Sequence, residues 1–154
     1  MKTTEQLWGD TRYAIRLCSR TARLYRRIQT AGTFLAIVGG SATIVSALGT
    51  LPHWLAASGS SLLAIAGAAL IAIRPADKAA QNEADVRRYQ AVLENSIGAS
   101  VEAFAAALEQ AHQGDAPEVD ALRNVAYNDM VKELGMPEHQ IPLSATERVL
   151  RAIA

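Results

Sequence analysis

The feature that most constrains this chain is a run of 46 residues, Ile28 to Ile73, that contains no Asp, Glu, Lys or Arg. A helix needs about 20 mostly apolar residues to cross roughly 30 Å of bilayer hydrocarbon. The run therefore has room for two such helices, and we predict them over residues 31–48 and 54–73. Between them lies the segment GTLPH, whose Gly49 and Pro52 favour a tight turn.

A buried helical hairpin inside a soluble protein is the alternative to two membrane spans. Helices of that kind normally carry polar residues along one face, and neither predicted span has a charge on any face. A signal peptide is not expected, because a long arginine-rich stretch precedes the first apolar run. The predicted fold class is an all-α membrane protein with an N-terminal amphipathic helix over 1–29, a transmembrane hairpin over 30–74, and a cytosolic helical domain over 75–154.

The charges outside the hairpin predict its orientation. Residues 1–27 hold seven basic and two acidic side chains, and residues 74–154 hold eight basic and thirteen acidic ones. The turn between the spans has no Lys or Arg, whereas the segments just outside both spans contain them. Because Lys and Arg near the ends of spans stay on the cytoplasmic side, both termini are predicted to be cytoplasmic. Cys18 is the single cysteine, which excludes an internal disulfide and is compatible with a reducing compartment.

Both predicted spans are rich in small residues repeated every four positions. Small side chains let membrane helices approach closely, so that dispersion contacts accumulate. One ridge is explained by the two spans packing on each other, and the presence of several ridges predicts a homo-oligomer. The candidate packing positions are Gly32, Ala36, Gly39 and Gly40 in the first span and Ser60, Ala64 and Ala68 in the second.

Hydroxyl side chains are the other polar feature of the hairpin. Thr43, Ser46 and Thr50 fall on one face of the first span. Such hydroxyls either bond back to a carbonyl one turn earlier or line a pore once about four or more subunits assemble. Because no charged residue lies within the spans, an ion-coupled transporter is not expected.

Residues 3–29 predict an amphipathic helix, weakened near Gly9 and Asp10. Its arginines fall within about 120° of arc, and its apolar residues lie largely opposite. This pattern is typical of a helix in the plane of the lipid headgroups. A second interpretation assigns part of the arginine stripe to a phosphate-bearing ligand, because the guanidinium fork matches phosphate.

Beyond the hairpin, apolar residues recur every three or four positions, which predicts one continuous helix from about Ala76 to Gln113. Val86, Ile97 and Leu108 recur at eleven-residue spacing, which indicates a nearly straight helix with one apolar stripe. In a protein that anchors a partner at the membrane, this stripe would be the docking surface.

Two shorter helices are predicted after this one. The first covers about Glu118 to Leu134 and is stopped by Gly135, and the last begins at Ser144, which has Glu147 in capping-box spacing. Within the first, Asp129 and Glu133 are expected on a solvated face. No catalytic or metal-binding motif is present, so we expect neither an enzyme, a cofactor nor a metal site.

The order of these features resembles the SLATT family. The resemblance rests on Trp8 in a basic N-terminal helix, the two short spans, the cytosolic element Arg87-Arg88-Tyr89-x-x-x-Leu93, and a last helix after Gly135-Met136-Pro137. It implies an anti-phage effector of the bacterial inner membrane that forms a pore and kills or arrests the infected cell. It also implies a nucleotidyltransferase or SLOG-type sensor encoded nearby, whose nucleotide-derived signal gates the pore through the cytosolic domain.

The expected ligand is a cyclic nucleotide or oligonucleotide, which would shift a gating equilibrium by binding open and closed states differently. Its phosphate contacts would weaken as salt rises. The alternative is a non-conducting membrane anchor or scaffold whose cytosolic helices recruit a protein partner. The candidate ligand-binding residues are Arg20, Arg23, Arg87, Arg88 and Arg123.

Overall fold

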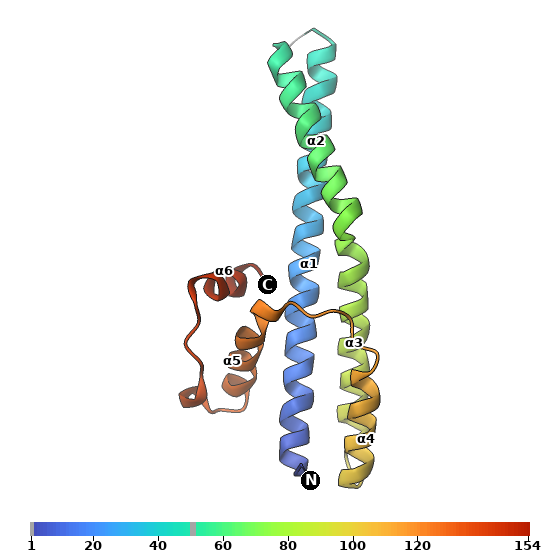
Figure 1. Cartoon of the computed structure of the whole chain (residues 1–154), viewed down its shortest axis with the longest axis vertical. Helices are drawn as coiled ribbons and strands as arrows, with labels where there is room; N and C mark the ends of the chain where they lie inside the picture. The colour runs from blue at the N-terminus through green and yellow to red at the C-terminus, as the bar shows by residue number, and fades with distance from the viewer. Residues whose placement is uncertain (1, 50–51) are drawn as a thin grey trace. The chain divides into compact units, whose positions relative to one another are not determined.

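A computed structural model describes residues 2–49 and 52–154, and every regular element in those two ranges is a helix (Figure 1). The chain divides into two compact units. The hairpin unit is Tyr25–Asp77, and the helical unit combines the residues up to Leu24 with Lys78–Ala154. The elements are α1 (Thr4–Ala47), α2 (His53–Ile73), α3 (Pro75–Asn95), α4 (Val101–His112), η1 (Asp120–Leu122), α5 (Arg123–Glu133), η2 (Pro137–His139) and α6 (Ala145–Ile153).

Two helical stretches, Thr4–Ser46 and Trp54–Asn95, are long and apolar enough to cross a membrane, and the hairpin unit holds the last part of α1 and the whole of α2. In the most apolar stretch of each helix, only 6% and 11%, respectively, is buried inside the protein. The core helix of a soluble protein would instead be mostly buried. Large apolar side chains point outward, with Ile65 70% and Ile71 79% exposed. The second of these helices begins and ends within one residue of the predicted span, because Pro52 precedes it and Arg74 ends it in a left-handed conformation.

The predicted weakening of the first helix near Gly9 and Asp10 is wrong. Helix α1 continues without interruption from Thr4 to Ala47. A single glycine costs a helix only about 1 kcal/mol relative to alanine, and packing of the neighbouring Leu7 compensates because that side chain is buried. The Thr11 hydroxyl donates to the Leu7 carbonyl at 2.7 Å, so it bonds within the helix and caps nothing.

The single helix predicted over 76–113 is also wrong, because a turn separates α3 from α4. Gly98 has φ +80°, which ends the helical path. Ser100 then caps α4 by accepting a hydrogen bond from the Ala103 amide at 3.2 Å. Ile97, predicted on the apolar stripe, lies in the turn and is 78% exposed. The chain reverses here, and α4 returns beside α3 (Figure 1).

The core of the helical unit joins α1, α3 and α4. The apolar face predicted to lie in lipid headgroups is therefore covered by protein, and Leu17 is fully buried. The stripe proposed as a docking surface is likewise occupied, because Tyr89, Phe104 and Leu108 belong to the same cluster. The residues of this cluster are Leu7, Ala14, Cys18, Tyr89, Phe104, Leu108 and Ala111.

The last helices follow the prediction more closely. Leu134 and Gly135, the latter with φ +73°, end the second helix as expected, although it begins later, as the turn η1 followed by α5. The capping box is confirmed, since the Ser144 hydroxyl accepts from the Glu147 amide and the Glu147 carboxylate accepts from the Ser144 amide. Helix α6 contacts η1 and α5.

Candidate functional site

The closest approach in the hairpin unit lies between Gly39 and Gly59. A Cβ on Gly39 would be 2.6 Å from the Gly59 carbonyl oxygen, so no larger residue fits without movement. A Cβ on Gly32 would meet only the side-chain end of Leu70, which can move aside. Gly40 is in looser contact with Leu63, and Ala36 is half-buried. In α2, by contrast, most of the predicted ridge faces outward, because Ala64 and Ala68 are exposed. Ser60 is exposed as well, but its hydroxyl lies 3.2 Å from that of Thr43 on α1.

The hydroxyls predicted to line a pore bond within the hairpin. Thr43 donates to the Gly39 carbonyl at 2.9 Å and lies 3.2 Å from the Ser60 hydroxyl oxygen. Ser46 is buried and donates to the Pro52 carbonyl at 3.2 Å. Thr50, the third candidate, lies outside the described residues. In the described conformation Thr43 thus bonds back to its own helix.

A ladder of ion pairs joins α1 to α5 in the helical unit. Arg16 donates through Nε and Nη2 to one oxygen of Glu133, at 2.9 and 2.7 Å, and Arg12 lies 3.6 Å from the other oxygen. One turn further, Arg20 pairs with Asp129 at 2.7 Å. The face predicted to be solvated is so in part: the side chains of Glu133 and Asp129 are 37% and 27% exposed, but α5 also places both carboxylates opposite the arginine stripe.

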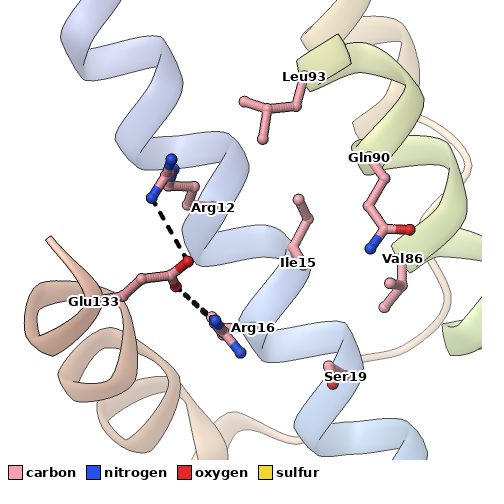
Figure 2. A pocket seen from close by; sticks show the side chains of 8 residues that line it. All are labelled: Arg12, Ile15, Arg16, Ser19, Val86, Gln90, Leu93 and Glu133. Carbon is pink, nitrogen blue, oxygen red and sulfur yellow. Dashed lines mark hydrogen bonds and ion pairs between the residues drawn. The ribbon is translucent and has the colours of Figure 1, made fainter.

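A cleft of about 320 Å³ opens beside this ladder (Figure 2). Two arginines and one carboxylate form its charged wall, and α3 supplies much of its apolar wall. No sequence motif indicates this cleft, although the four-residue spacing of Arg12 and Arg16 places both on one helix face. Its lining residues are Arg12, Ile15, Arg16, Ser19, Val86, Gln90, Leu93 and Glu133.

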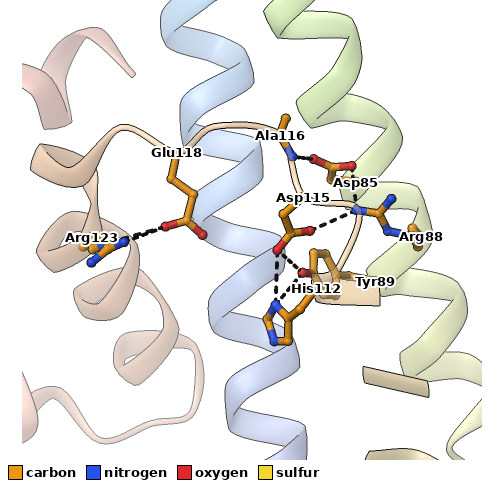
Figure 3. A network of polar contacts seen from close by, with 8 residues as sticks. All are labelled: Asp85, Arg88, Tyr89, His112, Asp115, Ala116, Glu118 and Arg123. Atoms are coloured by element: carbon orange, nitrogen blue, oxygen red, sulfur yellow. Dashed lines mark hydrogen bonds and ion pairs between the residues drawn. The ribbon is translucent and has the colours of Figure 1, made fainter. Parts of the chain in front are cut away.

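A second polar cluster fastens α3 to the end of α4 (Figure 3). The Tyr89 hydroxyl donates to the Asp115 carboxylate and lies 2.7 Å from His112 Nδ1. Arg88 bridges Asp85 and Asp115 at 2.8 and 2.9 Å. Burial, followed by the bond to Asp115, raises the pKa of Tyr89. The cluster therefore holds the returning chain against α3 and keeps the phenol protonated.

Comparison with known proteins adds no family to this geometry. No protein-family model, curated protein or solved structure matches the chain. Within 2–49 and 52–154, no group of three His, Cys, Asp or Glu side chains could hold a metal ion. The chemistry available at these sites is therefore argued from charge, hydrogen bonding and packing.

The five arginines predicted to bind a ligand do not converge on one cavity wall. Arg20 and Arg88 are bound to the carboxylates described above, and Arg123 pairs with Glu118 and Asp120 at 3.2 Å each. Arg23 is exposed and donates to the Ser19 carbonyl at 3.4 Å. Arg87 is exposed on α3. The structure instead brings Arg12 and Arg16 together at the cleft.

Proposed function

We propose that this chain is an inner-membrane protein of bacteria whose hairpin unit spans the bilayer twice, with both termini in the cytoplasm. The low burial of the apolar stretches supports two membrane spans. Only 11% of the most apolar stretch of the second helix is buried, and Ile71 is exposed, so these side chains need an apolar solvent. The seven basic residues of positions 1–27 and the absence of Lys or Arg in the turn support the orientation.

We further propose that several copies assemble and form an ion-conducting pore when activated. The observation that carries this proposal is the outward part of the ridge on α2: Ala64 and Ala68 are exposed, while the hairpin contact is made at Gly39 and Gly59 and between Thr43 and Ser60. A ridge of small residues that the hairpin itself leaves uncovered lets a neighbouring helix approach closely. Opening would depolarise the cell, which is the anti-phage role that the SLATT resemblance implies.

Opening of such a pore requires the hydroxyl contacts to rearrange. Thr43 donates to the Gly39 carbonyl and Ser60 to the Ala56 carbonyl, and the two hydroxyl oxygens lie 3.2 Å apart across the hairpin. Ser46 donates to the Pro52 carbonyl. To face water in a pore lumen, these hydroxyls must exchange their present partners for water. A nucleotide-derived ligand that binds the open state more tightly would supply the bias.

Cysteine cross-linking tests the assembly. Ala64→Cys and Ala68→Cys, each in a Cys18→Ser background, place single thiols on the ridge. Ala69→Cys is the control, because Ala69 is also exposed but lies about 100° or more around the helix from both ridge positions. We expect oxidation in membranes to give disulfide-linked dimers from the ridge variants and few from the control. Equal cross-linking at all three positions, or none at any, would contradict assembly through this face.

A non-conducting scaffold is the second candidate, and one observation favours it. Arg20, Arg88 and Arg123 are neutralised by carboxylates of the same unit, so the unit is complete without an anionic ligand. The double variant Thr43→Val, Ser46→Ala removes two hydroxyls with little change in shape. A pore should lose ion flux in this variant, whereas a scaffold should recruit its partner as before.

A further inference from the structure

We propose that the cleft between α1, α3 and α5 binds a small organic phosphate, whose phosphate group replaces the Glu133 carboxylate on Arg12 and Arg16. The binding itself is independent of conduction. Only one part rests on the proposed function, namely that the bound phosphate is the signal that gates the pore.

The position of Glu133 marks an anion site that is already built. Its carboxylate receives two hydrogen bonds from Arg16, at 2.9 and 2.7 Å, and lies 3.6 Å from Arg12 (Figure 2). The two guanidinium groups thus converge on one acceptor. A phosphate monoester offers more acceptor oxygens and more charge than a carboxylate, and the diester of a phospholipid headgroup matches the charge of a carboxylate, so either can engage both forks at once.

The charge of the cleft favours an incoming anion even while Glu133 is present. The lining contains two arginines and one glutamate and no other ionisable side chain, which leaves a net charge of one positive unit (2 − 1 = +1). The pairs are only partly shielded, with 40% of the Arg16 side chain and 37% of the Glu133 side chain exposed. A solvent-accessible ion pair contributes little stability, so its exchange for a phosphate is not prevented by burial.

The remaining walls fit the uncharged part of such a ligand. Ile15, Val86 and Leu93 present an apolar surface. The Ser19 hydroxyl and the Gln90 amide line the same space, and neither side chain forms a hydrogen bond to any part of the chain that the structure describes. They are available to a ligand that carries polar atoms on a compact body.

The size of the cleft limits the ligand class. Small-molecule sites usually occupy about 300–1,000 Å³, and this one, at about 320 Å³, lies at the lower end. A nucleoside monophosphate or the headgroup of a phospholipid is of suitable size, whereas an oligonucleotide would exceed the cleft. The shared chemistry of the two sources is a phosphate ester on a small polar body.

Replacement of Glu133 has a direct structural consequence. Glu133 is the last residue of α5, and its pair with Arg16 ties that end of the helix to α1. The Arg20–Asp129 pair, one turn earlier, remains in place. Ligand binding is therefore expected to release the end of α5 from α1 while the rest of the helix stays attached.

Binding to the full-length chain in nanodiscs tests the proposal, with adenosine monophosphate as the soluble probe and adenosine as the probe without phosphate. We expect the monophosphate to bind, adenosine to bind far more weakly, and Arg16→Gln to weaken monophosphate binding about tenfold through the loss of a charged fork. Glu133→Gln removes the competing carboxylate and should strengthen binding several-fold. Arg148→Gln, an equal charge change at an exposed position of α6 outside the cleft, is the control and should leave affinity unchanged.

Two nanodisc compositions distinguish the sources of phosphate. If an anionic lipid headgroup occupies the cleft, phosphatidylglycerol discs should bind the monophosphate less tightly than phosphatidylcholine discs, and Arg16→Gln should abolish this difference. Repulsion by the charged disc surface alone would lower the affinity of both proteins by the same factor. No binding of the monophosphate in either disc, binding that Arg16→Gln leaves unchanged, or weaker binding in Glu133→Gln would overturn the proposal. Those results would leave the pore itself untouched, because ion flux and cross-linking are measured separately.

Discussion

Gly39 and Gly59 face each other backbone to backbone, and each occupies the space that a side chain on the other would need. A Cβ on Gly39 would lie 2.6 Å from the Gly59 carbonyl oxygen, and a Cβ on Gly59 would lie 2.7 Å from that of Gly39. Two helices can approach this closely only where both lack side chains. The contact fixes how α1 and α2 pack within the hairpin unit.

Alanine at this contact should destabilise the hairpin. Gly39→Ala and Gly59→Ala force the helices apart, and overpacking of this kind costs about 1–3 kcal/mol. Gly67→Ala is the matched control, because a Cβ there meets nothing within 4 Å. Denaturation in detergent, followed by circular dichroism, measures the difference. If all three variants unfold together with the wild type, the close contact is not what holds the hairpin.

Replacement of Arg74 by glycine should stabilise the folded protein. It ends α2 with φ +50°, and it is the one residue other than glycine with positive φ in the part of the chain described. A non-glycine residue in this conformation costs about 1 kcal/mol, and its ion pair with Asp77 is exposed and contributes little. Arg74→Gly should therefore raise the unfolding temperature by a few degrees. Gly98→Ala, at φ +80°, should lower it.

The attachment of α6 should weaken in acid. Glu147 accepts hydrogen bonds from Ser144 and from the Asn124 side chain, and these bonds lower its pKa from the ordinary 4.5. A lowered pKa in the folded state means that the contribution is complete above pH 4.5 and is lost as the pH falls through the folded value.

Hydrogen exchange of the α6 amides, measured from pH 6 to pH 3 and corrected for the intrinsic rate, follows this loss directly. Glu147→Gln keeps an oxygen acceptor but cannot titrate, so its corrected protection should be independent of pH. An identical acid response in both proteins would assign the effect to another carboxylate.

Cys18 should be almost inert in the folded protein. Burial, followed by the nearby charges of Asp115 and Asp85, raises its pKa from 9.0 to about 12. The reactive thiolate is thus about a thousandfold scarcer at neutral pH than for an ordinary cysteine. Labelling with a maleimide should be very slow in native membranes and fast in denaturant. Since Cys18 is the single cysteine, rapid labelling of the native chain could only mean that this core is open.

Sequence reasoning succeeded where one local pattern decides the structure. The absence of charge from Ile28 to Ile73 located the two apolar helices, and the spacing of Ser144 and Glu147 identified the capping box. The prediction of one continuous helix failed at Ile97. Apolar residues keep a helical spacing on both sides of this position, although the chain turns at Gly98, which has positive φ. A periodic pattern does not record a reversal of the chain.

The candidate site was less accessible to sequence, because its pairs are distant along the chain. Arg16 and Glu133 are 117 positions apart, and nothing in either neighbourhood indicates the other. Arg16 and Arg20 were assigned to lipid or to a ligand on one face of their helix, whereas tertiary packing pairs each with a carboxylate of α5. The small-residue ridges were recognised, but which ridge forms the hairpin contact depends on the rotation of one helix against the other.

The most direct test of the pore is the membrane potential of bacteria that express this chain, followed with a voltage-sensitive dye during induction and during phage infection. We expect the potential to collapse in cells with the wild-type chain and to hold in cells with Gly39→Ala at equal membrane levels. A potential that stays steady under both conditions, with the wild-type protein inserted in the membrane, would contradict the account.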